Sequence, residues 1–121
     1  MNKKIALYAM LIFYAFAGIN HFSNPEFYLN IIPSYLGDAS LINLLAGVAE
    51  IVLAVLLLFK ATRTVAAYGI ILMLIAFIPT HLYMLQTGFC AGTYCAPEWL
   101  LWIRLLLLQP LLIAWAWWVR N

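Results

Sequence analysis

Four long apolar stretches alternate with short polar stretches along the chain. The apolar stretches cover residues 5–22, 41–59, 65–85 and 99–119. Each is close to the roughly 20 residues that an α-helix needs to cross the hydrocarbon core of a membrane. None has the alternation of a barrel strand, and a helix satisfies its own backbone hydrogen bonds in lipid. The pattern therefore predicts an all-α fold, with residues 1–121 forming one domain, a transmembrane four-helix bundle.

The connection between the first two predicted spans is unlike the other connections. Residues 25–36 are too short and too interrupted by prolines to cross a membrane, yet they carry Phe27, Tyr28 and Tyr35. Aromatic rings of this kind favour the boundary between lipid and water. We therefore expect a short interfacial segment here. It is either a plain connector or a lid over the end of the bundle.

Composition supports a membrane location. Hydrophobic residues make up 68% of the chain and charged residues 8%, whereas a soluble domain is about half apolar and about a quarter charged. This excludes an ordinary soluble enzyme and a disordered chain. The net charge of +2 is too small for a phosphate-binding face, so we expect no nucleic-acid partner. The expected partner is the lipid bilayer itself.

The basic residues predict an orientation. Five of the six lie on one side of the predicted spans: Lys3, Lys4, Lys60, Arg63 and Arg120. The connections on the other side, residues 23–40 and 86–98, contain no lysine or arginine. The positive-inside rule then places both termini in the cytoplasm, as in a multi-pass protein of a bacterial-type inner membrane.

An alternative interpretation concerns the first span. A basic start, an apolar run and the triplet Ala15-Phe16-Ala17 together resemble a cleavable secretory signal. We retain the first span as a membrane helix. The other three spans would keep their orientation under either interpretation.

Cys90 and Cys95 lie in the connection that is predicted to face outward. Two cysteines on the oxidising side of a membrane favour a disulfide. A catalytic thiol pair is the alternative, but the gap of four residues differs from the two of the common redox motif. A metal site built with His81 lacks further ligands, so we expect no metal centre.

Two charged residues interrupt the apolar spans, Glu50 and Arg104. A charge at the centre of a membrane helix costs about 2.5–3.5 kcal/mol, so such residues usually face a partner. Their depths differ by about 6 Å along the helix axes, which predicts a Glu50–Arg104 pair, formed directly or through one water. Glu50 also shares a stripe with Asn43, Gly47 and Ala54, and small or polar stripes face neighbouring helices.

Further polar residues lie at a similar depth in the other spans. Tyr14, Gly18 and His21 share one face of the first helix, so His21 is predicted to point inward. Gln109 follows Arg104 by five positions, which predicts that the two lie on different faces of the last helix.

The resulting candidate cluster has five members: Asn20, His21, Glu50, His81 and Arg104. Two interpretations remain open. The cluster is either a set of structural hydrogen bonds or a site for a small molecule, because ionisable groups inside membranes serve both purposes. Among ligands, a quinone fits better than a haem held by the two histidines. No catalytic residue is assigned.

Two motifs give the chain a resemblance to a known family. The first is Gly-x-x-His-Phe-x-x-Pro over Gly18–Pro25, and the second is Gly-x-x-Glu over Gly47–Glu50. With Arg63, Pro79 and Arg104, they make most of the chain similar to DoxX-like membrane proteins. That family usually carries Arg-Leu-Pro-Leu-Gln in its last helix, whereas here Arg104 and Gln109 are one residue further apart. The cysteine pair lies outside the pattern.

The resemblance implies a four-helix inner-membrane protein without fixing an activity. The namesake is associated with a thiosulfate:quinone oxidoreductase, and distant relatives act as chaperones or cargo receptors. We therefore expect an accessory or scaffold protein that is not itself an enzyme. It would have no cofactor and would contact other membrane subunits or a second copy. The alternatives are a quinone-linked subunit of an oxidoreductase and a small-solute transporter. The transporter is less favoured because four helices leave little room for alternating access.

Overall fold

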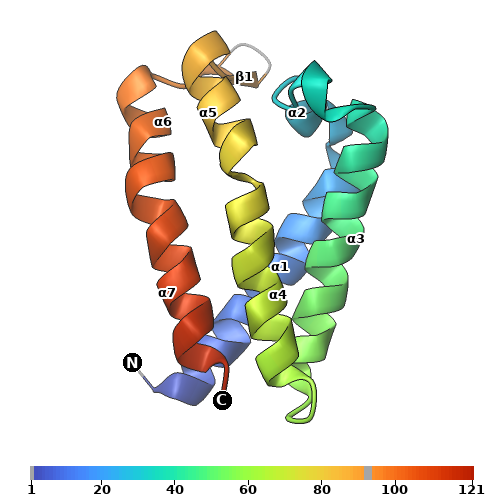
Figure 1. Cartoon of the computed structure of the whole chain (residues 1–121), viewed down its shortest axis with the longest axis vertical. Helices are drawn as coiled ribbons and strands as arrows, with labels where there is room; N and C mark the ends of the chain where they lie inside the picture. The colour runs from blue at the N-terminus through green and yellow to red at the C-terminus, as the bar shows by residue number, and fades with distance from the viewer. Residues whose placement is uncertain (1, 92–93) are drawn as a thin grey trace.

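The computed structural model describes residues 2–91 and 94–121, and four long helical segments form an antiparallel bundle (Figure 1). The first two segments are α1, Lys3–Ser23, and α3, Ala39–Leu58. The third comprises α4, Arg63–Ala76, and α5, Ile78–Thr87; the fourth comprises α6, Glu98–Ile103, the π-helical turn η2, Arg104–Leu108, and α7, Gln109–Val119. All four segments are long and apolar enough to cross a membrane. The predicted four-span helical fold is confirmed.

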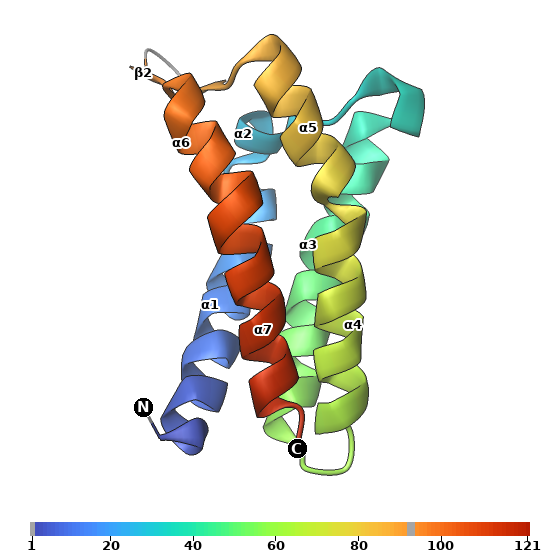
Figure 2. The ribbon, with the colours of Figure 1, turned by 60° about the vertical axis from the view of Figure 1, so that its left-hand side comes forward.

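Short elements occupy the end of the bundle opposite the termini (Figures 1 and 2). Helix α2, Pro25–Leu29, and the 3₁₀ turn η1, Ser34–Leu36, connect α1 to α3. Strands β1, Cys90–Ala91, and β2, Tyr94–Cys95, pair antiparallel with Cys90 opposite Cys95. The two cysteines form a disulfide, as the sequence predicts.

The helices enclose two different interiors. Near the termini α1 packs on α3, α3 on α4, α4 on α7 and α7 on α1, and the side chains between them are apolar. Met10, Leu57 and Ile70 are fully buried there. Towards the other end α5 packs on α6 and η2. The buried polar side chains belong to the middle of the bundle and to this second half: His21, Asn43, Glu50, His81 and Gln109.

Two glycines allow α1 and α3 to approach closely. A Cβ atom on Gly18 would lie 2.9 Å from the carbonyl oxygen of Gly47, and one on Gly47 would lie 2.8 Å from the Cβ of His21. Small residues let helix backbones come together in membrane proteins. The approach brings the side chain of His21 against the polar stripe of α3.

Two prolines interrupt the last two spans. Pro79 has no N–H to donate to the preceding turn, and α4 gives way to α5 at Phe77. Pro110 is the second residue of α7, directly after η2 and Gln109. The Gln109 N–H donates to the carbonyl oxygen of Arg104, the first residue of η2. This bond reaches back five residues instead of four, so the turn is a π-bulge, a feature frequent at functional sites.

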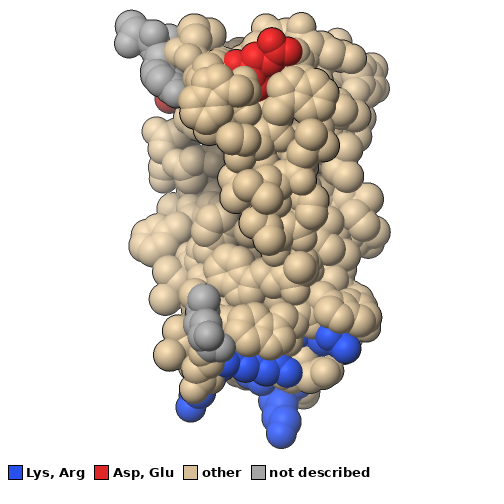
Figure 3. Space-filling model, turned by 90° about the vertical axis from the view of Figure 1, so that its left-hand side faces the viewer, with Lys and Arg blue, Asp and Glu red and all other residues tan. Residues whose placement is uncertain are grey.

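The charges separate along the bundle axis. Figure 3 shows lysine and arginine at one end and acidic residues at the other. We call the end that carries both termini and the α3–α4 turn the basic end (Figure 1). The opposite end carries Glu26, Asp38 and Glu98 at the starts of α2, α3 and α6. The uneven distribution of basic residues along the sequence thus corresponds to a separation of charge between the two ends of the bundle.

The close approach of α1 and α3 can be tested with two alanine substitutions. Gly47→Ala places a methyl group against the fixed Cβ of His21, whereas Gly69→Ala meets only the mobile Cδ2 of Leu53, at 2.7 Å. Overpacking a rigid contact costs about 1–3 kcal/mol. We expect Gly47→Ala to lower the midpoint of thermal unfolding in detergent clearly more than Gly69→Ala. Equal midpoints would contradict a close approach at Gly47.

Candidate functional site: a buried polar cluster

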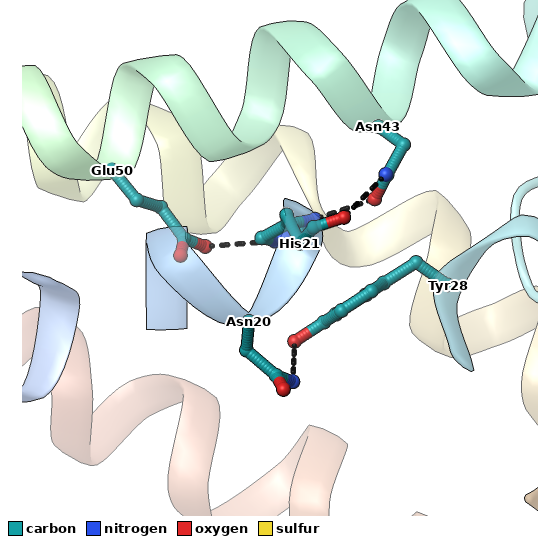
Figure 4. Close-up of polar contacts among 5 residues, drawn as sticks. All are labelled: Asn20, His21, Tyr28, Asn43 and Glu50. Carbon is teal, nitrogen blue, oxygen red and sulfur yellow. Dashed lines mark hydrogen bonds and ion pairs between the residues drawn. The ribbon is translucent and has the colours of Figure 1, made fainter. Parts of the chain in front are cut away.

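His21 is the centre of a polar network between α1 and α3 (Figure 4). Its Nδ1 lies 2.6 Å from Oδ1 of Asn43, and Asn43 Nδ2 donates to the backbone carbonyl of His21 over 2.9 Å. Its Nε2 lies 3.4 Å from Oε1 of Glu50. All three residues are more than nine-tenths buried. The predictions that His21 and Glu50 face the interior are confirmed.

The two contacts with Asn43 indicate that the Nδ1 atom of His21 carries a proton. The Asn43 amide nitrogen donates to a carbonyl, so the Asn43 Oδ1 must accept a proton from His21 Nδ1. A neutral imidazole would then have only a lone pair on Nε2, facing an oxygen of Glu50. The Nε2–Oε1 contact is an ion pair when the His21 ring is protonated.

Helix α2 covers this network. The Tyr28 ring stacks on the His21 ring with centroids 3.8 Å apart and an interplanar angle of 18°. Asn20 Nδ2 donates to the Tyr28 hydroxyl oxygen over 2.5 Å. Burial raises the pKa of the Tyr28 phenol above its usual value, so the ring stays neutral. Of the two interpretations of residues 25–36, the structure favours the lid over the plain connector. We call the part formed by α2 the cover.

The cover also contacts the segment that connects α5 to β1. The Phe27 ring meets the Phe89 ring edge-on, with centroids 5.0 Å apart. Phe89 directly precedes β1, and its carbonyl oxygen accepts from the N–H of Ala96, which directly follows β2. The disulfide-closed hairpin and α2 therefore meet across the end of the bundle.

Arg104 has a different partner from the one predicted. Its Nη1 donates to Oε1 of Gln109 over 2.6 Å, and Gln109 Nε2 donates to the carbonyl oxygen of Leu74 on α4. Among residues 2–91 and 94–121, the only carboxylate within ion-pair distance of a basic side chain is Glu50, and its partner is His21. The predicted direct Glu50–Arg104 ion pair is wrong, and so is the prediction that Gln109 lies on another face.

The π-bulge explains both errors. Residues five apart are about 140° apart around an α-helix, but the wider η2 turn brings them onto one side. The sequence signal for this turn is Pro110, which cannot donate to the carbonyl of Leu106. Gln109, Asn43 and Tyr28 belong to the site and are missing from the cluster predicted from the sequence, although Asn43 was placed on the inward stripe.

Three buried polar atoms lack hydrogen-bond partners in the described part of the chain: Tyr14 Oη, Glu50 Oε2 and His81 Nδ1. They come from α1, α3 and α5. Most buried polar groups are paired. These three atoms therefore have unused capacity for hydrogen bonds.

The candidate residues thus divide into three groups. His21 and Glu50 contact each other directly. Asn20 is hydrogen-bonded to Tyr28 of the cover. His81 and Arg104 belong to the third and fourth helical segments. Within the described ranges, no three histidine, cysteine or acidic side chains are grouped to hold a metal ion.

Comparison with known proteins places the chain in a family. A family model described as a domain of unknown function, DUF8561, matches residues 10–120. The chain belongs to this DUF8561 family. No curated protein and no solved structure matches it. The DUF8561 region contains every residue of the polar cluster, so the buried site lies within the shared domain.

The bridge from Arg104 through Gln109 to α4 can be tested by an isosteric substitution. Gln109→Met keeps the length of the side chain but leaves the guanidinium and the Leu74 carbonyl without this partner. A lost partner for a buried polar group costs about 1–3 kcal/mol. We expect a lower thermal midpoint for Gln109→Met than for Gln86→Met, which changes an exposed glutamine. A Gln109→Met protein as stable as the Gln86→Met control would contradict the bridge.

Proposed function

We propose that this protein is a small accessory or scaffold protein of a bacterial-type inner membrane. One observation carries the proposal: the polar side chains inside the bundle mostly bind neighbouring helices. His21 binds Asn43 and Glu50 on α3, and Gln109 binds the backbone of α4. Such bonds hold four helices in one arrangement without requiring a ligand. The expected partners are other membrane subunits or a second copy.

The proposed orientation places the basic end in the cytoplasm. Its support is the segregation of charge in Figure 3 together with the positive-inside rule. The disulfide-closed hairpin belongs to the opposite end, where an oxidising compartment would preserve it. In this orientation the cover formed by α2 lies at the outer surface of the membrane.

Thiol labelling tests the orientation. We expect a membrane-impermeant maleimide to label Cys90 and Cys95 in intact cells only after treatment with a reductant. As a matched control, Ala61→Cys in a Cys90→Ser/Cys95→Ser background introduces a single thiol in the exposed α3–α4 turn. That thiol should react in inverted vesicles and not in cells. Labelling of Ala61→Cys from outside would reverse the proposed orientation.

The DoxX-like relationship is retained as a proposal. Its support includes the geometry of the last helix, where this sequence departs from the usual spacing. The π-bulge compensates for the additional residue, because Arg104 and Gln109 are in contact despite their separation of five. An insertion absorbed by a π-bulge preserves the contact that a four-residue spacing gives in an α-helix.

A second candidate function is a quinone-linked subunit of an oxidoreductase. Two observations favour it. Tyr14, Glu50 and His81 each present an unpaired polar atom, and a quinone head needs a few precisely placed polar groups in an apolar pocket. The buried His21–Glu50 contact also supplies two groups that would exchange protons with a bound quinone. The third candidate, a small-solute transporter, has no comparable support.

A ligand titration distinguishes the first two candidates. A quinone at a hundred times its dissociation constant stabilises its receptor by about 2.7 kcal/mol. For an accessory protein we expect no change in the thermal midpoint of the purified protein when short-chain quinones are added.

A quinone-dependent rise in the thermal midpoint would favour the second candidate instead. Tyr14→Phe and His81→Asn should then abolish that rise. Tyr68→Phe, which changes a tyrosine away from the cluster, should preserve it. This set of variants separates binding at the cluster from nonspecific insertion of quinone into the detergent micelle.

A further inference from the structure

A groove runs along the outside of the bundle between α7 and the α4–α5 segment. Its volume is about 470 Å³. One wall includes Tyr68, Ile71 and Ile78, and the other includes Pro110, Ala114 and Trp117. The walls are almost entirely apolar, and Gln109 is the one buried polar residue among the lining residues. Because the groove lies on the surface of membrane-crossing helices, lipid is its natural environment.

The side chain of Arg120 places a positive charge at the basic end of the groove. The Arg120 guanidinium carbon lies 3.7 Å from the centroid of the Trp117 ring, and its Nη1 donates to the Trp117 carbonyl. The Tyr68 and Trp117 rings meet edge-on at 6.0 Å. Within residues 2–91 and 94–121, Arg120 has no carboxylate within ion-pair distance. Its charge is therefore available to an anion at the mouth of the groove.

The length of the groove matches one leaflet of a bilayer. Tyr68 and Ile78 are ten positions apart, which corresponds to about 15 Å along a helical segment. The hydrocarbon core is about 30 Å thick, so half of it is also about 15 Å. A chain that starts at the headgroup level beside Arg120 would end near the midplane, beside Ile78 and Leu105.

We propose that this groove binds one acyl chain of an anionic phospholipid, whose phosphate lies on Arg120. The phospholipid belongs to the leaflet at the basic end. Basic residues at the membrane surface attract anionic headgroups, and the aromatic rings of Tyr68 and Trp117 suit the headgroup boundary.

A second copy of the chain fits the groove less well. A helix about 10 Å across and about 15 Å long displaces on the order of 1,000 Å³, more than twice the volume of the groove. Helices also approach each other through small residues, and of the groove residues named above only Ala114 is small. A single flexible acyl chain suits both the width and the bulky walls.

Native mass spectrometry with lipid analysis tests the proposal. The protein is purified in a mild detergent and exposed to equal amounts of phosphatidylglycerol and phosphatidylcholine. We expect the wild-type protein to retain one phosphatidylglycerol. Ala114→Phe, at an exposed position, fills the groove and should lose the lipid. Val52→Phe, at a lipid-facing position on α3 that is 47% exposed, should retain it.

A second pair of variants tests the headgroup contact. Arg120→Gln should reduce the preference for phosphatidylglycerol about fivefold, and Arg120→Lys should preserve most of it. Retention of lipid by Ala114→Phe, or equal retention of both lipids by the wild type, would overturn the proposal. A wild-type dimer that Ala114→Phe converts to a monomer would also overturn it and assign the groove to a second copy. Thermal midpoints establish that each variant is folded.

Discussion

The close approach of α1 and α3 is the constraint on which the buried site depends. Gly18 and Gly47 leave no room for a Cβ between the two backbones. His21 therefore reaches Asn43 and Glu50 directly, across a distance that larger residues would open. Because the helices are also apolar on the outside, lipid offers the polar groups no alternative partner. The glycines therefore allow the polar contact, and that contact offsets part of the free-energy cost of burying His21 and Glu50.

The interior divides into an apolar half and a polar half for a related reason. Near the basic end, residues such as Met10, Leu57 and Ile70 fill the space among four mutually packed segments. Beyond Glu50, prolines and the π-bulge change the course of α5 and of η2. Helix breaks free backbone groups, which side chains must then satisfy. Gln109, which binds the Leu74 carbonyl beside the break in α4–α5, performs this function.

Much of this arrangement could be predicted from the sequence. The spans follow from the length of the apolar stretches, and the inward faces of Tyr14, His21 and Glu50 follow from helical periodicity. The disulfide follows from two cysteines on one predicted side. The partner of Arg104 could not be predicted in the same way. Depth along the helix indicated Glu50, but the rotation around the axis depends on whether five residues form an α-turn or a π-turn. Local backbone geometry, which periodicity assumes to be regular, decided that contact.

The polar contacts fall into two sets that face each other across the bundle. His21 ties α1 to α3, whereas Gln109 ties α7 to α4. The unpaired atoms of Tyr14, Glu50 and His81 belong to three different helical segments, α1, α3 and α5. Any group that satisfied all three would contact three helical segments at once, because no single helix pair contains all three. Tyr28 of the cover stacks on His21, the residue paired with Glu50. A molecule bound to all three atoms would therefore affect the packing of three of the four spans.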